Sequence, residues 1–113
     1  MSTVYHESGL SKEAESAHRA LASMIEELEA VDWYNQRADV AQDEELKKIL
    51  LHNRNEEIEH ASMLLEWLRR NIPEFDEELK TYLFTKKSIV DIEEKEEDKS
   101  LSDIGSGDLG IGG

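Results

Sequence analysis

Two long stretches without glycine or proline, separated by only three residues, constrain this fold more than any other feature of the sequence. The first runs from about Ser11 to Asp39, and the second runs from Asp43 to Asn71. Apolar residues recur in both at steps of three and four, which marks one buried stripe along an α-helix. Because the link between them is so short, we expect the two helices to be antiparallel neighbours.

The residues at the ends of these stretches support the helix boundaries. Ser11 and Asp43 are good N-cap residues, and acidic residues follow each of them in the first turn. Pro73 then predicts a third, shorter helix that extends to about Phe84. We therefore predict an all-α fold, an antiparallel helical hairpin plus a short third helix.

The remaining segments lack a sustained apolar period. We expect residues 1–10 to form a flexible N-terminal arm ahead of a helical domain that covers residues 11–85. Residues 86–105 are mostly charged and cannot bury enough apolar area to offset the entropy of ordering them, so we expect a disordered acidic linker.

Charge and composition limit the possible partners. The chain has 27 acidic and 13 basic residues and a formal net charge of −14, which argues against nucleic acid and anionic membranes as partners. It has no cysteine, so any metal would have to be held by His and carboxylates. No apolar run approaches the roughly 20 residues that cross a bilayer, and we expect a soluble cytosolic protein.

Polar residues interrupt the apolar stripes where core residues are expected. Asn53, Glu57 and His60 lie in the core row of the second helix, and Glu27 lies in that of the first. Burying an unpaired carboxylate costs several kcal/mol, so such groups are expected to be paired or to bind metal. Arg54 is the only basic residue near the middle of the hairpin, which disfavours an explanation by ion pairs alone.

A Glu and a His three residues apart on a helix can hold one cation together. The sequence contains two such pairs, Glu57 with His60 and Glu15 with His18. The second pair lies off the main apolar row, and we interpret it as part of a solvated face. The first lies on the core row, which favours a metal site.

The number of candidate ligands fits a dimer. Di-iron carboxylate bundles use four Glu and two His, and two copies of Glu27, Glu57 and His60 supply that set. A single hairpin also cannot cover its own apolar stripe, so we predict that two chains complete a four-helix bundle. Tyr34, seven residues after Glu27, could be plain core, or it could hydrogen-bond a ligand or donate an electron.

Four stretches of the helical body closely resemble the encapsulated ferritins: residues 26–34, 52–60, 66–70 and 81–85. The resemblance implies that Glu27, Glu57 and His60 are ferroxidase ligands and that Tyr34 lies beside them. It also implies that Glu26, Glu29 and Trp33 line the path by which iron reaches the site. The expected substrate is Fe(II), oxidised to Fe(III) with two ions at each dimer interface.

The same resemblance extends to assembly and to the end of the chain. It implies a decameric ring of dimers that is cargo of an encapsulin nanocompartment in the cytoplasm. Residues 106–113 would then be an encapsulin-targeting peptide, in which Leu109-Gly110-Ile111-Gly112 enters an apolar groove of the shell protein as an extended strand. Taken alone, this Gly-rich end would be interpreted as a linker.

We therefore predict a ferroxidase that feeds iron storage. Two alternatives remain open on the sequence. One is a di-iron peroxidase that removes oxidant, in which iron oxidation is incidental. The other is an acidic helical adaptor that binds no transition metal.

Overall fold

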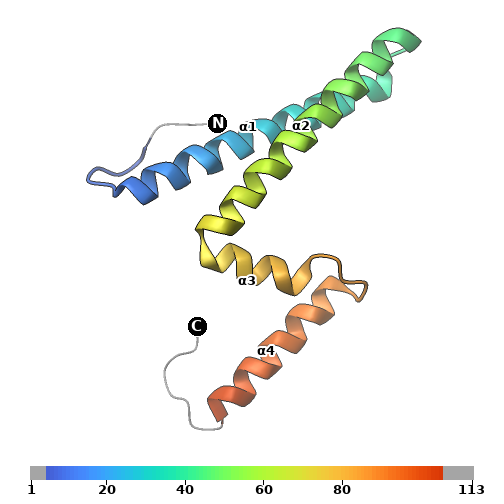
Figure 1. Cartoon of the computed structure of the whole chain (residues 1–113). Coiled ribbons are helices and arrows are strands. Elements are labelled where there is room, and N and C mark those ends of the chain that lie inside the picture. Colours follow the sequence, from blue (N-terminus) through green and yellow to red (C-terminus); the bar gives the residue numbers. More distant parts are fainter. Residues whose placement is uncertain (1–4, 106–113) are drawn as a thin grey trace. The chain divides into compact units, whose positions relative to one another are not determined.

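The computed structural model describes residues 5–105, and every regular element in that range is an α-helix. The helices are α1 (Lys12–Val40), α2 (Glu44–Asn71), α3 (Pro73–Tyr82) and α4 (Ile89–Gly105), as Figure 1 shows. The all-α fold class is therefore confirmed. The predicted targeting peptide, with Leu109 and Ile111, lies outside the described residues.

The predicted caps form at both long helices. The Ser11 side chain accepts a hydrogen bond from the Ala14 backbone N–H at 3.1 Å. The Asp43 carboxylate accepts from the N–H groups of Glu45 and Leu46 at 3.0 and 3.4 Å. These bonds satisfy N–H groups that have no partner within the helix, and the acidic first turns complement the helix dipoles.

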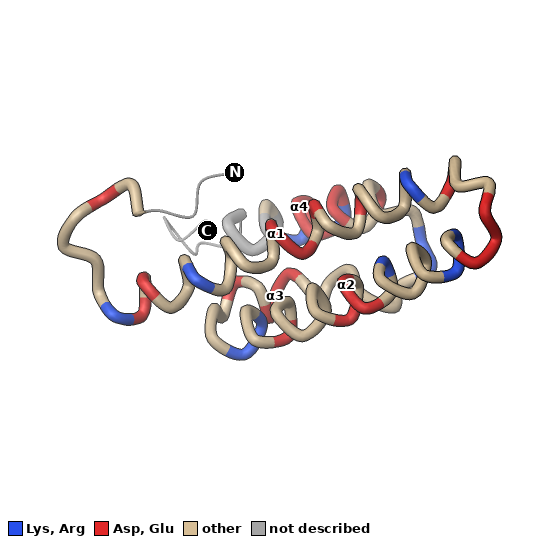
Figure 2. Tube along the Cα trace, turned by 90° about the horizontal axis from the view of Figure 1, so that it is seen from above, with Lys and Arg blue, Asp and Glu red and all other residues tan. Residues whose placement is uncertain are grey.

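The first unit of the chain ends at Pro73 and contains the hairpin of α1 and α2. The two helices run side by side in opposite directions, as predicted (Figures 1 and 2). Their shared core is built mainly from small side chains, which let the helices approach closely. The buried residues are Ala20, Ala22, Ala38, Ala61 and Leu68.

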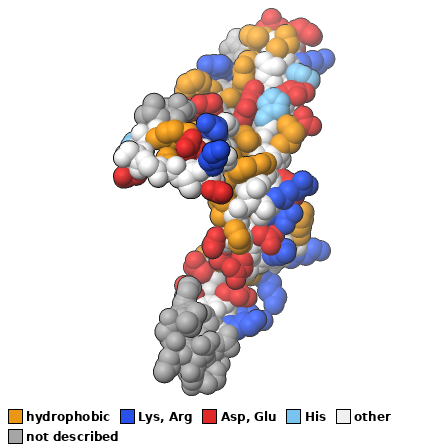
Figure 3. All heavy atoms as spheres, turned by 60° about the vertical axis from the view of Figure 1, so that its left-hand side comes forward, with side chains coloured by type: hydrophobic (Ala, Val, Ile, Leu, Met, Phe, Trp, Pro, Cys, Tyr) orange, Lys and Arg blue, Asp and Glu red, His pale blue; other side chains and the backbone are white. Residues whose placement is uncertain are grey.

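Larger apolar side chains of the hairpin reach solvent. Leu28 is 50% exposed, Ile58 is 44% exposed, and Leu46 on the predicted core row of α2 is 47% exposed. Apolar side chains are visible among charged ones on the surface in Figure 3. One hairpin therefore leaves much of its apolar stripe open, as expected for helices that pack against a further partner.

The second unit begins at Glu74 and contains most of α3 together with α4. α3 ends at Tyr82, two residues earlier than expected. Phe84 adopts a left-handed conformation with φ of 62°, which an α-helix cannot continue through. The Thr85 hydroxyl donates to the Tyr82 carbonyl at 2.7 Å and closes the last turn.

The predicted disordered linker over residues 86–105 requires correction, because Ile89–Gly105 form α4. The prediction relied on the lack of apolar residues to bury. A helix also gains from local propensity, and the middle of this segment, residues 93–99, is rich in Glu and Lys, which are good helix formers. Ser88 caps the helix by accepting from the Asp91 N–H at 3.4 Å, and Asp91 stands four residues before Lys95, which suits an ion pair.

No helix in the described part of the chain combines the length and the apolar character needed to cross a membrane.

Candidate metal centre

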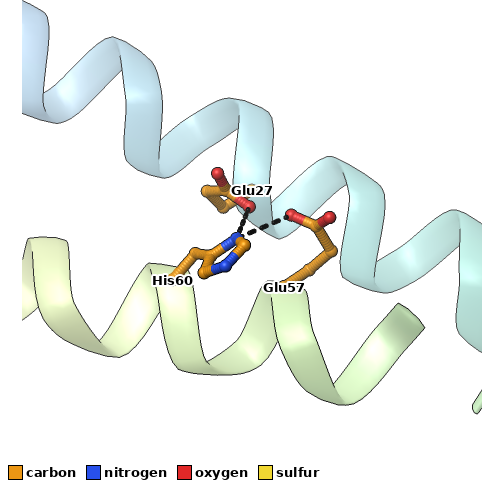
Figure 4. A group of neighbouring side chains, drawn as sticks. All are labelled: Glu27, Glu57 and His60. Atoms are coloured by element: carbon orange, nitrogen blue, oxygen red, sulfur yellow. Dashed lines mark ion pairs between the residues drawn. The ribbon is translucent and has the colours of Figure 1, made fainter. Parts of the chain in front are cut away.

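Glu27, Glu57 and His60 come together in the middle of the hairpin (Figure 4). His60 Nδ1 lies 3.4 Å from Glu27 Oε2 and 3.5 Å from Glu57 Oε2. One ligand atom of each residue lies within 4.8 Å of the others. Three of the four polar residues singled out from the core rows are thus neighbours in space.

Two features of the sequence produce this arrangement. Glu57 and His60 project from the same side of α2 because they are three residues apart. Because the link between the helices is short, α2 returns alongside α1, and Glu27 near the middle of α1 faces the middle of α2 (Figure 4). Arg54 Nη1 also donates to Asn35 Oδ1 at 2.9 Å, a hydrogen bond that joins the two helices.

The cluster is partly shielded from solvent. The side chains of Glu27 and Glu57 are each 25% exposed, and that of His60 is 40% exposed. Glu27 Oε2 itself is buried, and it accepts no hydrogen bond from any group in the described part of the chain. A buried carboxylate oxygen without a hydrogen bond is rare, and a bound cation would satisfy it.

The ligand set fits a transition metal with a preference for oxygen. Carboxylate and imidazole together suit iron, manganese and zinc, whereas carboxylates alone favour calcium or magnesium. A single chain supplies three ligands, which leaves coordination positions open to a substrate or to a second chain. The residues present therefore fit the iron predicted from the sequence.

A second acidic group shares the same histidine. Glu56 and Glu59 lie near His60 on α2, and His52 Nε2 lies 3.5 Å from Glu56 Oε1. Both glutamates are exposed, and exposed acidic groups are common without any bound ion. The spacing of four residues between His52 and Glu56 predicts this pair from the sequence. Both side chains are exposed, so the pair does not indicate a metal site.

The other predicted site residues lie on α1, as Glu27 does. Glu26 is exposed and Glu29 is half-buried. Trp33 and Tyr34 both contact Arg37, whose guanidinium lies 5.8 Å from the Trp33 ring centroid and 5.6 Å from that of Tyr34. Within the described residues, no interaction joins these four predicted residues to Glu27, Glu57 or His60, so their roles stay predictions.

The Glu15 and His18 pair has a different setting from Glu57 and His60. The Tyr5 ring meets the His18 ring edge-on, with 4.7 Å between centroids. The Tyr5 hydroxyl donates to Glu15 Oε2 at 3.5 Å. The residues just before α1 therefore fold back on its first turns, a contact that the sequence pattern did not predict.

The chain is similar to known proteins over most of its length. The EncFtn-like family model matches residues 2–86. A ferritin-like protein of Thermotoga maritima is 55% identical over 113 residues, which is 98% of this chain and 97% of the relative. An encapsulated ferritin-like protein of Rhodospirillum rubrum is 50% identical over 112 residues, which is 91% of this chain and 80% of the relative. The crystal structure of a protein from Nitrosomonas europaea superposes with a TM-score of 0.73 at 61% identity, covering 75% of this chain and 96% of that one.

Proposed function

This chain belongs to the EncFtn-like family, and we propose that it oxidises Fe(II) to Fe(III) at a di-iron site shared by two chains. The observation that carries the proposal is the cluster of Glu27, Glu57 and His60, with its buried Glu27 oxygen that accepts no hydrogen bond within the described residues. Iron is the substrate of this site.

Two chains are needed because one chain supplies only half of the ligands of a di-iron bundle. Two copies of the cluster give four carboxylates and two imidazoles, the set that such bundles use. An apolar groove of the hairpin adjoins the cluster and offers a surface for the second chain. It is lined by Met24, Leu28, Val31, Ile58, Ala61, Ser62 and Leu65.

The ligands also suit the direction of the reaction. Carboxylate oxygens are hard donors, so they stabilise Fe(III) more than Fe(II) and favour loss of an electron from the bound ion. Two Fe(II) ions supply the two electrons that convert dioxygen and two protons to hydrogen peroxide. The negative charge of the ligands offsets the charge that the iron gains.

Single substitutions test the site directly. Glu27→Ala, Glu57→Ala and His60→Ala should each abolish rapid oxidation of Fe(II), because each removes a ligand from both halves of the site. The initial rate is measured from the near-ultraviolet absorbance of Fe(III) after anaerobic Fe(II) meets dioxygen.

Glu15→Ala and His18→Ala form the matched control, because they remove the other Glu-x-x-His pair of the chain. These two variants should retain the wild-type rate. Wild-type rates in all three ligand variants would overturn the proposed site. Consumption of many peroxide molecules per Fe(II), in the presence of a reductant, would instead indicate a peroxidase.

We further propose that the protein delivers its iron inside an encapsulin nanocompartment. One relative is described as an encapsulated ferritin-like protein. In this chain Leu109 and Ile111 stand two residues apart near the end, so both would point to one side of an extended strand. The helix α4 would act as a spacer, since 17 residues of helix span about 25 Å.

Truncation separates packaging from chemistry. Removing residues 106–113 should abolish co-purification with the shell protein and leave the initial rate of iron oxidation unchanged. Leu109→Ala with Ile111→Ala should have the same effect, whereas Asp108→Ala should not. Continued packaging of the truncated chain would refute the targeting role.

A further inference from the structure

The guanidinium of Arg37 lies over the rings of two aromatic residues of α1, Trp33 and Tyr34. The guanidinium carbon of Arg37 lies 5.6 Å from the Tyr34 ring centroid and 5.8 Å from that of Trp33. The spacings of three and four residues place all of them on one side of the helix. Both distances are within the range of about 6 Å in which a cation is attracted to a ring face.

Arg37 has no carboxylate partner among the residues that the structure describes. None of the ion pairs found among residues 5–105 involves Arg37, although the chain has 27 acidic residues. Tyr34 is half-buried, and Trp33 is 53% exposed. The guanidinium therefore acts on the two rings as an unpaired positive charge, at least partly screened by solvent.

We propose that Arg37 protects Trp33 and Tyr34 from one-electron oxidation while iron is oxidised at the cluster of the same hairpin. This inference rests on the proposed ferroxidase function. Removing an electron from a ring leaves a radical cation until the ring loses a proton. The guanidinium repels this cation, so the attraction in the reduced state becomes repulsion at the step of electron removal. Both rings therefore become harder to oxidise.

Iron alone can supply the electrons that dioxygen needs, so neither ring has to be oxidised. Reduction of dioxygen to hydrogen peroxide takes two electrons and two protons, and two Fe(II) ions can supply both electrons. If Tyr34 supplied one, it would lose an electron and a proton, one Fe(II) would stay unoxidised, and a tyrosyl radical would remain in the protein. Of the two functional roles predicted for Tyr34, the position of Arg37 favours a hydrogen-bonding neighbour over an electron donor.

The first test uses metal-free protein, so that it does not depend on ferroxidase activity. Azide radicals generated by pulse radiolysis each take one electron from a ring and become azide. Oxidised Trp33 and Tyr34 are then counted by peptide mass spectrometry relative to Trp67 of the same chain. The variants are Arg37→Gln, which removes the charge, and Arg37→Lys, which keeps it.

Arg37→Gln should raise the oxidation of Trp33 and Tyr34 roughly three- to tenfold, while Arg37→Lys stays near the wild type. Arg19→Gln is the matched control, since it removes an exposed arginine from the same helix. Equal oxidation in the wild type and Arg37→Gln would overturn the proposal. An equal rise in Arg37→Lys and Arg37→Gln would also overturn it, because the charge would then have no part.

Two further measurements distinguish the effect of the Arg37 charge from the proposed ferroxidase function. Concentrated salt should raise oxidation of the two rings in the wild type, which tests the role of charge without any substitution. With Fe(II) and dioxygen, Arg37→Gln should accumulate more oxidised Trp33 and Tyr34 per iron oxidised. A wild type that oxidises no iron would refute the proposed function, while the azide result would still decide the role of Arg37.

Discussion

At the scale of single residues, the Glu27 carboxylate bears most directly on function. Its Oε2 atom is buried, lies 3.4 Å from His60 Nδ1 and accepts no hydrogen bond within the described residues. Leaving such a group unsatisfied costs about 1–3 kcal/mol in a folded protein. A bound cation would offset that cost, so the candidate site would trade stability of the metal-free chain for affinity.

Glu27→Gln tests this trade, because it keeps the shape of the side chain and removes its charge. We expect the metal-free variant to melt at the same temperature as the wild type or above it. We expect its affinity for Co(II), a spectroscopic substitute for Fe(II), to fall more than about tenfold, since a charged ligand is lost. A lower melting temperature with unchanged Co(II) affinity would show that Glu27 serves the fold alone.

The sequence predicts the three residues of the candidate metal centre but not the contacts of the residues around them. Glu27, Glu57 and His60 are visible because they occupy positions in apolar rows, which depend only on helical periodicity. The contact of Arg54 with Asn35 depends on the register between two helices, and periodicity within one helix does not define it. The contacts of Arg37 depend on its side-chain conformation, which sequence spacing permits but does not fix.

At the scale of helices, local sequence signals predict where a helix begins better than they predict whether a charged segment is helical or disordered. The caps at Ser11 and Asp43 are confirmed because each requires only a side chain and the next backbone N–H groups. For α4, the lack of an apolar face predicts disorder, but the high helix propensity of Glu and Lys favours a helix, and the prediction of disorder requires correction. The early end of α3 follows from the conformation of Phe84, which no residue type at that position signals.

The last turns of α2 carry a network that predicts a dependence on pH. Glu66 Oε1 lies 2.7 Å from Arg69 Nε, and its Oε2 lies 2.7 Å from Arg70 Nε. Hydrogen bonds from Arg69 and then Arg70 lower the pKa of Glu66 from 4.5 to about 2. Because the pKa is lowered by folding, the stabilisation is complete above the usual value and is lost as the pH falls towards about 2.

Glu66→Gln should therefore lower the melting temperature at neutral pH, and the difference from the wild type should shrink as the pH falls below about 4.5. Circular dichroism melts over this pH range measure it. Glu77→Gln, which removes the same charge from an exposed carboxylate of α3, is the control for net charge. A difference that stays constant down to pH 2 would contradict the role of the ion pairs.

At the scale of the whole molecule, two opposing terms act on pairing of chains. Apolar side chains such as Leu28 and Ile58 are about half exposed on the hairpin, and covering them favours association. The net charge of −14 opposes association, and pairing would bring two Glu27 and two Glu57 carboxylates into one region. A divalent cation removes that repulsion, so metal binding and assembly should be linked.

We therefore expect Fe(II), added without oxygen, to shift the chain from small to larger species in sedimentation velocity. Leu28→Asp should prevent this shift, because it places a charge in the apolar groove beside the site. Val40→Asp is the matched control, since Val40 is 75% exposed at the far end of α1. If Leu28→Asp assembled with metal as the wild type does, the second chain would have to bind elsewhere. If the wild type gave one distribution with and without Fe(II), the cluster would not be shared between chains, since a site completed by pairing must favour the paired state when its metal is present.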